Sequence, residues 1–518
     1  MQEQIIILGA GVMQGPAMRI AQEMGLYTVV VDADSRAPCV GMADRFEQID
    51  LKDKEGIESL ARSIQGTASG LGGIMTAGTD FSASVAWVAE RLGLPGIPYE
   101  AALNASDKQR MRACFEKAQV PSPAFTVLNA IPTGATTVPP FPVVVKPVDN
   151  MGSRGCRRVN GHDELAAAVA DALRFSRSGR AIVESFMEGP EFSVDAIVYD
   201  DEIIICGLAD RHIYFPPYFI EMGHTMPTCF PSQDQEALLE TFKDAVRALG
   251  IAGKGCRGAA KGDVKLTPSG PMIGEVAARL SGGYMSGWTY PYSSGVEPIR
   301  GAIQVCRDQR PDCLVPTRSW TCAERAFISI PGKVHSILGI EEAQSGVRDL
   351  FLRAEAGKEV KFPENNVSKC GNIIAVAPGR EEAVQAAEDA ARTVLIRLEP
   401  HNPDTDAFLA VAPGDPSSGP AFPPDAFTLD PELRAALARL PDLPFTGSLS
   451  GAVVPFPEFT ASGLRDYQGR DIEASLRAVG ELTGLSLTIE PGVSPWAGVF
   501  GLPLSGAAIR VRRILSII

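Results

Sequence analysis

Two acidic residues, Asp263 and Glu275, are joined by a segment whose pattern predicts a tight hairpin. The run DVKL alternates polar and apolar residues, TPSG has turn chemistry, and PMIGEV is again apolar. A hairpin of this length returns Glu275 to the side of Asp263. Adjacent carboxylates repel each other unless a cation lies between them, and their hard oxygens suit Mg²⁺ carried by a nucleotide phosphate. A solvent-facing hairpin with scattered charges is the alternative.

An apolar strand upstream ends in a lysine and leads directly into a glycine-containing loop. The strand is FPVVVKPV (Phe141–Val148), which delivers Lys146, and the loop is DNMGSRG (Asp149–Gly155). The backbone N–H groups of such a loop can surround a phosphate. The pattern is not a P-loop, because GxxxxGK[ST] is absent. An edge strand with a surface lysine is the alternative.

The segment AIVESFMEGPEFSVDAIVYD (Ala181–Asp200) is predicted to form two strands around the turn EGPE. Phe186 and Met187 are placed to bound an adenine slot in which backbone groups read the edge of the base. Glu191 is placed to accept hydrogen bonds from ribose hydroxyls. Taken alone, the segment is more simply explained as an ordinary hairpin.

These motifs, in this order, resemble the ATP-grasp superfamily of carboxylate–amine ligases. The ordered set begins with SDK (Ser106–Lys108) and ends with EVAARLSGG, and the resemblance covers roughly residues 1–398. It implies an α/β and α+β multidomain protein, in which a Rossmann-like domain precedes an ATP-grasp fold and a C-terminal α+β region follows. ATP and Mg²⁺, or Mn²⁺ in its place, are the implied cofactors.

The resemblance also implies a role for each matching residue. By this resemblance, Lys108 and Lys146 contact the ATP phosphates, and the loop with Ser153 closes over them. Glu184, Phe186 and Met187 form the adenine hinge, largely through backbone atoms, and Glu191 binds ribose. Asp263 and Glu275 hold Mg²⁺, and Arg279 stabilises the acyl phosphate and the oxyanion. The sequence departs from the pattern twice. Asp263 stands where Glu is more usual, and Ala277 stands where Asn is common, which puts a second metal ion in doubt.

Substrate identity is expected to depend on DRHIYFPPYFIEMGHTMP (Asp210–Pro227). Its prolines exclude a helix through the stretch, and a loop with aromatic, acidic and histidine side chains suits a small-molecule pocket. A surface loop is the alternative. The stretch resembles PYFxExGH of bacilysin-type L-amino-acid (dipeptide) ligases. That resemblance implies that Glu221 binds the substrate ammonium and that His224 contacts the substrate or the attacking amine. Arg279 can also hold a carboxylate, and Gly282 leaves room beside it.

Composition bounds the partners and the compartment. A net charge of −14 argues against nucleic acid, and ten cysteines without a CxxC pair favour reduced thiols in the cytoplasm. No apolar run reaches the length of a membrane span, and the N-terminus lacks the basic region of a signal peptide. We expect a cytoplasmic homodimer whose partners are a small carboxylate and an amine.

The opening strand leads into GAGVMQG (Gly9–Gly15), a helix, and YTVVVDAD with an acidic strand end at Asp32. This βαβ pattern suits a dinucleotide, but the spacing GxGxxxG is not the usual one, so a scaffold role is expected. In the stretch 107–125 a helix is predicted that Ser106 or Asp107 caps and that VPSP stops, and further helices are predicted over 163–176, 235–250, 380–399 and 470–484. The predicted domains are 1–104 (Rossmann-like), 105–318 (ATP-grasp, with subdomains of about 125–187 and 188–318), 319–400 (C-terminal lobe), 401–427 (linker) and 428–518 (small domain of unassigned role).

The expected activity is activation of a carboxylate by ATP and its transfer to an amine, most simply an amino acid, to form a peptide bond. A purine-pathway or carbamoyl-phosphate-type ligase is an alternative within the same fold. A non-catalytic ATP-binding regulatory protein is the alternative from another class, and Ala277 gives it some support.

Overall fold

The computed structural model describes residues 2–133, 136–215, 217–399, 402–404, 453–457 and 486–490. The chain divides into two compact units. The first comprises Met1–His212, Gly223–Ala323 and Val376–Arg380, and the second comprises Ile213–Met222, Glu324–Ala375 and the described residues after Arg380. Among the described residues, no helix has both the length and the apolar character that crossing a membrane requires.

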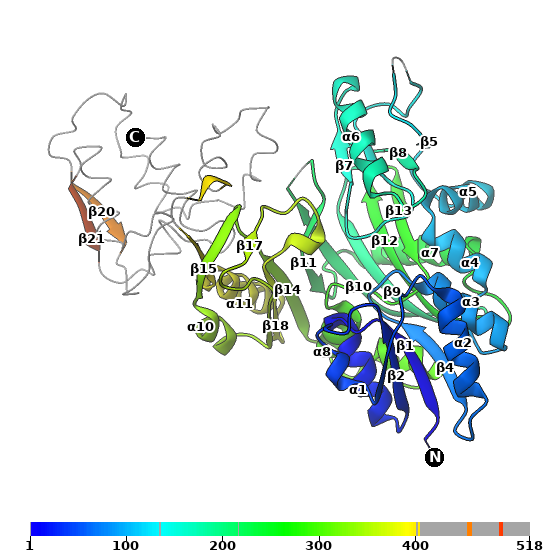
Figure 1. Ribbon diagram of the computed structural model, residues 1–518. Coiled ribbons are helices and arrows are strands. Elements are labelled where there is room, and N and C mark those ends of the chain that lie inside the picture. Colours follow the sequence, from blue (N-terminus) through cyan, green and yellow to red (C-terminus); the bar gives the residue numbers. More distant parts are fainter. Residues whose placement is uncertain are drawn as a thin grey trace. The chain divides into compact units, whose positions relative to one another are not determined.

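The first unit begins with a parallel sheet covered by helices on both faces (Figure 1). One face packs on α1 (Gly15–Glu23) and α9 (Pro298–Val305), and the other on α2 (Lys54–Gln65) and α3 (Ser82–Leu92). Apolar side chains point to both faces, as a sheet buried on two sides requires. The predicted βαβ opening is confirmed. The strand order is β3 (Arg45–Gln48), β2 (Tyr27–Asp32), β1 (Gln4–Leu8) and β4 (Leu71–Thr76).

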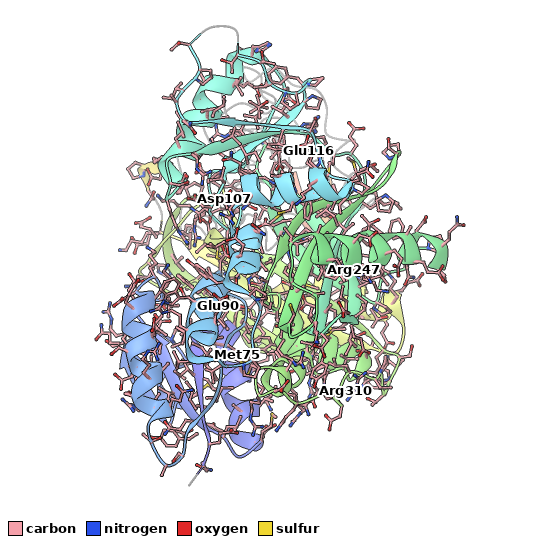
Figure 2. All side chains as sticks on the ribbon, turned by 90° about the vertical axis from the view of Figure 1, so that its right-hand side faces the viewer. Met75, Glu90, Asp107, Glu116, Arg247 and Arg310 are labelled. Carbon is pink, nitrogen blue, oxygen red and sulfur yellow. The ribbon has the colours of Figure 1, made fainter. Side chains whose placement is uncertain are left out.

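Two helices lead from this sheet to a small antiparallel sheet. They are α4 (Tyr99–Ser106) and α5 (Lys108–Ala118), and Figure 2 labels Asp107, the residue between them. The Asp107 carboxylate caps α5 by accepting from the N–H groups of Gln109 and Arg110. The small sheet packs its apolar face on α6 (His162–Phe175). Its strand order is β5 (Phe125–Leu128), β8 (Ala181–Ser185), β6 (Val143–Pro147) and β7 (Arg157–Val159).

Four long antiparallel strands complete the framework of the first unit. Alternate side chains of these strands pack on α7 (Ser232–Ala248), so the opposite faces of β9 and β12 are free to carry polar groups. The short helix α8 (Tyr290–Ser294) follows the hairpin. The strands lie in the order β13 (Gly270–Ala277), β12 (Arg257–Thr267), β9 (Glu191–Tyr199) and β10 (Glu202–Tyr214).

The second unit has a core built from short strands and the helix α11 (Arg380–Thr393). β17, β15 and β19 form one sheet, and β16 pairs with β18. The elements are β11 (Ile220–Met226) and β14 (Thr321–Phe327), which both extend into the first unit, β15 (Gly332–Leu338), α10 (Ile340–Ser345), β16 (Asp349–Leu352), β17 (Glu359–Val360), β18 (Gly371–Ala377) and β19 (Leu395–Leu398). Further along the chain, β20 (Val453–Pro457) and β21 (Ser486–Glu490) pair in parallel.

Three predictions are wrong. The helix predicted over 380–399 ends at Thr393, because the apolar residues after it form β19 against β15. The strands β8 and β9 belong to different sheets, so 181–200 is not a hairpin. Residues 210–227 are mostly strand and not a loop.

The predicted linker 401–427, domain 428–518 and helix 470–484 lie outside the described residues, except for 402–404, β20 and β21. The domain boundaries remain predictions.

Candidate functional site

The acidic hairpin is confirmed, since Asp263 on β12 pairs directly with Glu275 on β13. Across β12, Asp263 also faces Ser193 on β9, and Lys261 faces Asp195. Paired residues point their side chains to the same face of a sheet. The face opposite α7 therefore collects carboxylates and lysines from three neighbouring strands.

The two carboxylates of the hairpin have partners of opposite charge. Asp263 forms ion pairs with Lys261 and with Arg211 (Nη1 to Oδ1, 3.2 Å), and accepts a hydrogen bond from Ser193 (3.2 Å). Glu275 lies 3.3 Å from the ammonium of Lys108. Both carboxylates are thus neutralised by protein cations, which a bound metal and phosphate would have to displace or share.

The charge state of the site follows from these contacts. Burial raises the pKa of Glu275, but Lys108, Lys146, Lys261 and Arg279 outweigh burial and hold the pKa at about 2. Burial lowers the pKa of Lys108, but the carboxylates of Glu275 and Asp80 outweigh it and raise the pKa above its ordinary value. At neutral pH the carboxylate is ionised and the lysine is protonated, as a site for a metal and phosphates requires.

The donor set suits one divalent ion carried by a nucleotide. Asp263 and Glu275 offer hard oxygens from paired positions, whereas Ala277 offers no ligand. Within the described ranges, no group of three or more His, Cys, Asp or Glu side chains is arranged to hold a metal ion. Mg²⁺ typically takes one or two carboxylates and completes its shell with phosphate oxygens and water, so the two residues fit it.

Glu184 lies buried between two cations. Its carboxylate lies 2.7 Å from Lys146 Nζ and 2.9 Å from Nε of Arg112, a fully buried residue. Burial raises the pKa of Glu184, but Arg112 and Lys146 together lower it below its ordinary value. Arg112 also donates to the Gly274 carbonyl (2.6 Å), so it ties the small sheet to the hairpin. The predicted strand that delivers Lys146 is confirmed as β6.

The turn after β8 carries the residues predicted to bind adenine and ribose. The Phe186 N–H donates to the Pro142 carbonyl (3.0 Å), and the ring lies 4.4 Å from the Arg158 guanidinium. The Met187 carbonyl accepts from Lys265 (3.0 Å). Glu191 pairs with Arg211 and lies 3.6 Å from Lys265. Glu191, Lys265 and the turn therefore lie together, beside the Asp263 end of the hairpin.

The loop Met151–Gly155 contains three residues with left-handed backbone. Gly152, Ser153 and Gly155 have φ values of 68°, 59° and 65°. The Lys108 ammonium donates to the carbonyl of Asn150 (2.9 Å), immediately before the loop. Lys108, the loop and Lys146 thus approach the hairpin from the small-sheet side.

Arg279 follows β13, in a loop that touches the N-terminal sheet. Its Nη1 donates to the Leu280 carbonyl (3.1 Å), and its Nε is buried without a hydrogen-bond partner. Buried polar atoms are normally satisfied, so this Nε–H is a donor that a polar ligand could use. Gly282 and Gly78 pack backbone to backbone, since a Cβ on Gly282 would lie 3.3 Å from the Gly78 oxygen.

Asp195 anchors the Arg279 loop from β9. Its carboxylate accepts from the N–H (3.2 Å) and hydroxyl (2.5 Å) of Ser281 and is fully buried. Burial raises its pKa from 3.8 to about 6, although the bonds from Ser281 lower it. The folded protein therefore binds more protons than the unfolded chain between about pH 4 and pH 6.

We expect Asp195→Asn to change how stability depends on pH. In the wild type this group makes stability fall as pH rises through about 4 to 6, by about 3 kcal/mol in total. Asparagine keeps an acceptor for Ser281 but removes the titration, so the fall should disappear. Urea unfolding of both proteins from pH 4.5 to 7.5 measures the difference. Parallel pH profiles for the two proteins would contradict the raised pKa.

The two predicted amino-acid-binding residues lie on β11. In the second unit the Glu221 N–H donates to Asn366 (2.8 Å), and Lys369 donates to the Glu221 carbonyl (2.7 Å). His224, in the first unit, is 1% exposed. Side chains alternate along a strand, so residues three apart point to opposite faces. Glu221 and His224 are therefore not expected to line the same surface of β11.

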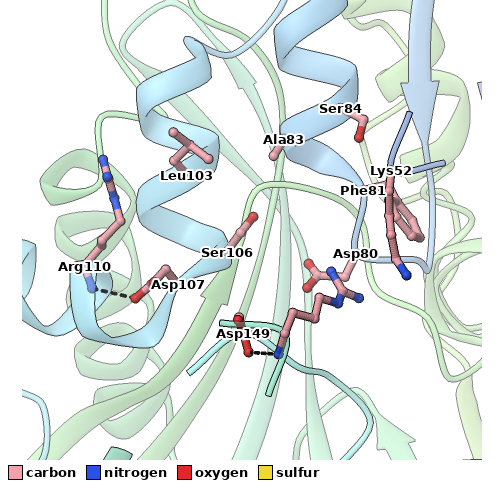
Figure 3. A pocket seen from close by; sticks show the side chains of 11 residues that line it. Lys52, Asp80, Phe81, Ala83, Ser84, Leu103, Ser106, Asp107, Arg110 and Asp149 are labelled. Atoms are coloured by element: carbon pink, nitrogen blue, oxygen red, sulfur yellow. Dashed lines mark hydrogen bonds between the residues drawn. The ribbon is translucent and has the colours of Figure 1, made fainter. Parts of the chain in front are cut away.

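A pocket of about 350 Å³ opens among the N-terminal end of α3, the helices α4 and α5, and the loops that carry Lys52, Asp149 and Arg177 (Figure 3). It is lined by Lys52, Asp80, Phe81, Ala83, Ser84, Leu103, Ser106, Asp107, Arg110, Asp149 and Arg177. The Asp149 carboxylate accepts from the Arg177 N–H (3.0 Å), and Asp80 is one of the carboxylates that raise the Lys108 pKa. The pocket thus adjoins the site on the Lys108 side.

The glycine turn after β1 is filled by the protein itself. The Gln14 carboxamide accepts from the Gly11 N–H (3.0 Å), and Asp32 accepts from the Ala10 N–H (2.8 Å). A Cβ on Gly9 would meet the Gln14 side chain at 3.0 Å. The N–H groups of Ala10 and Gly11, and the Asp32 carboxylate, are already used, which favours the predicted scaffold role over dinucleotide binding.

Four residues of the site were not identified from sequence: Arg112, Asp195, Lys261 and Lys265. The lysines alternate with Asp263 in KGDVK, and a period of two places them on its face, so this signal was present. Arg112 precedes Phe115 by one helical turn, on the apolar side of α5, which marks it as buried. Asp195 has no such local signal.

Comparisons with known proteins agree with this geometry. Residues 139–286 match the family "ATP-grasp domain", and residues 326–399 match "L-amino acid ligase C-terminal domain 2". Carnosine synthase 1 of Gallus gallus is 25% identical over 312 residues, which are 55% of this chain and 33% of that protein. D-alanine–D-alanine ligase of Marinobacter nauticus is 32% identical over 170 residues, 31% of this chain and 51% of that enzyme. The chain thus spans a third to a half of these two relatives.

A solved structure gives the same result for the fold. The L-amino acid ligase from Bacillus licheniformis superposes with a TM-score of 0.66 at 21% sequence identity, over 77% of this chain and 99% of that one. At this identity the likeness establishes the fold alone. The expected multidomain fold class is confirmed.

Proposed function

We propose that this chain, which carries an ATP-grasp domain followed by an L-amino acid ligase C-terminal domain, is an ATP-dependent carboxylate–amine ligase. It would convert a carboxylate to an acyl phosphate, join it to the amine of an amino acid, and release ADP and phosphate. The observation that carries the proposal is the set of four cations around the Glu275 carboxylate, Lys108, Lys146, Lys261 and Arg279. Such a set matches a reaction between ATP and a carboxylate, which are both anionic.

The chemistry needs alignment and charge neutralisation more than it needs a protein nucleophile. Lys108 and Lys146 would bind the phosphates, which requires Glu275 and Glu184 to share them. Asp263 and Glu275 would hold Mg²⁺, which neutralises phosphate charge when bound. The buried Nε of Arg279 would donate to the acyl phosphate and to the oxyanion that forms as the amine attacks.

The nucleotide would extend from these lysines to the turn after β8. The Phe186 ring and the Met187 backbone would bound adenine, and Glu191 would accept from ribose hydroxyls. Glu191 and Asp263 share Arg211, which is consistent with ribose and metal sites at adjacent positions. The loop containing Ser153 would cover the phosphates, as its positive-φ backbone can direct N–H groups toward an anion.

Amino acids are proposed as substrates for two reasons. Two of the relatives reported above are named for joining amino acids, and the C-terminal domain of an L-amino acid ligase recurs in this chain. Gly282, three residues after Arg279, has no side chain that would block a small substrate from approaching the backbone there. Small-molecule substrates, cytoplasmic location and a homodimer are retained as parts of this proposal.

The test is a screen of amino-acid pairs with phosphate release as the readout. We expect ATP cleavage only when a suitable carboxylate donor and an amine acceptor are both present, since an acyl phosphate without an acceptor does not turn over. Mass spectrometry should then find the coupled product. Glycine with phosphoribosylamine, and bicarbonate with ammonia, test the alternative ligases. ATP binding without cleavage across all of these sets would favour a regulatory protein.

A further inference from the structure

A lysine lies directly across from the position where the hairpin lacks a metal ligand. In the β12–β13 register, Lys261 pairs with Ala277 just as Asp263 pairs with Glu275. Paired side chains in an antiparallel sheet start about 5 Å apart on the same face. The methyl group of Ala277 leaves the space above it to the longer Lys261 side chain.

The Lys261 ammonium is directed at the metal-binding carboxylates. It forms an ion pair with Asp263, and its charge lowers the pKa values of both Glu275 and Asp195. Its side chain is only 14% exposed, so little solvent screens this charge. One fixed positive charge thus lies among three carboxylates, next to a position without a ligand.

We propose that the Lys261 ammonium takes the place of a second metal ion, so that this site binds one divalent cation per ATP. The inference rests on the proposed function for the location of the nucleotide. Two carboxylates, Asp263 and Glu275, can hold one metal ion between them, whereas a second ion would need a further oxygen at position 277. The lysine supplies the positive charge of that second ion and repels any cation that approaches.

Counting bound metal tests the proposal without any ligase reaction. Mn²⁺ serves as the probe, and electron paramagnetic resonance measures free Mn²⁺ in titrations with protein and a non-hydrolysable ATP analogue at equal concentrations. The wild type should bind one Mn²⁺ per nucleotide complex. Two bound ions in the wild type would overturn the proposal. Because only nucleotide binding is needed, this result stands whether or not the substrate screen finds a ligase.

A matched set of variants separates the lysine's role from a structural one. The double variant Lys261→Met with Ala277→Asn should bind two Mn²⁺, and Lys261→Arg should keep one. A double variant that binds nucleotide but still takes one Mn²⁺ would overturn the proposal. Lys243→Met, which removes a lysine on α7 paired only with Glu240 among the described contacts, is the control and should behave as wild type.

Metal dependence of turnover supplies a second readout. At equimolar Mg²⁺ and ATP, Lys261→Met should turn over on the order of 10²-fold more slowly than wild type, because one charge-neutralising group is lost. Excess free Mg²⁺ should restore much of the rate in the double variant Lys261→Met with Ala277→Asn, which offers an oxygen to the second ion, and should leave the wild type unchanged. A deficit in the double variant that no Mg²⁺ concentration reduces would contradict the replacement.

Discussion

Replacing Arg279 by alanine should abolish most turnover and leave ATP binding nearly intact. The guanidinium lies after β13, its Nε is buried without a partner, and it contributes to the low pKa of Glu275. A donor aimed at charge that develops in the transition state contributes about 10²–10³-fold in rate. We therefore expect kcat to fall by that factor, while the Kd for an ATP analogue changes by less than about threefold, or roughly 0.6 kcal/mol.

The control for this variant is Arg247→Ala, which removes an exposed arginine that pairs with Asp244 on α7. Its kcat should equal that of the wild type. Both variants should show the same circular dichroism and the same binding of the analogue by calorimetry. If Arg279→Ala turns over at the wild-type rate, Arg279 does not stabilise the oxyanion. If it loses the analogue instead, Arg279 belongs to the nucleotide site.

The largest effect on stability is expected for Glu184→Gln. The substitution preserves shape but removes the only negative charge that contacts both Lys146 and Arg112 among the described residues. Arg112 is fully buried, and its Nη1 already lacks a hydrogen-bond partner. Leaving buried cations unpaired costs about 3–5 kcal/mol, so the free energy of unfolding should fall by about that amount.

Urea unfolding monitored by tryptophan fluorescence measures this loss. Glu116→Gln, an exposed position on α5 shown in Figure 2, is the matched control and should change the free energy of unfolding by less than about 0.5 kcal/mol. Adding Arg112→Met to the variant should recover part of the loss, because the buried charge is then removed on both sides. A Glu184→Gln protein as stable as the control would show that the ion pairs contribute little.

The acidic hairpin could be predicted from sequence because its information is local. TPSG specifies the turn, so the return of Glu275 to the side of Asp263 follows from about twenty residues, whereas their direct pairing also depends on a register shift between Asp263 and Val264 that the alternation does not specify. The opening βαβ unit was predictable for the same reason. The helix predicted over 380–399 was too long, because the residues after Thr393 suit a helix or a strand equally. Only their pairing with β15 decides between the two.

The contacts of Glu184 could not be predicted, because they join distant parts of the chain. In AIVESF the glutamate occupies one alternate position of a strand and looks like a solvent-facing residue. Its partner Arg112 precedes it by 72 residues, on a helix between the sheets. The same holds for Asp195 and Ser281, which are 86 residues apart. Such pairs follow from the tertiary arrangement and leave no periodic trace in either segment.

The contact between Gly78 and Gly282 has a consequence for how substrate range can evolve. Gly78 has a φ of 67°, and a Cβ there would lie 2.8 Å from the Cβ of Met13, so a larger residue is strained as well as crowded. A side chain at Gly282 would press on the Gly78 backbone at 3.3 Å. Under the proposed function, a descendant that accepts a different substrate is therefore expected to change elsewhere around Arg279 and to keep Gly78.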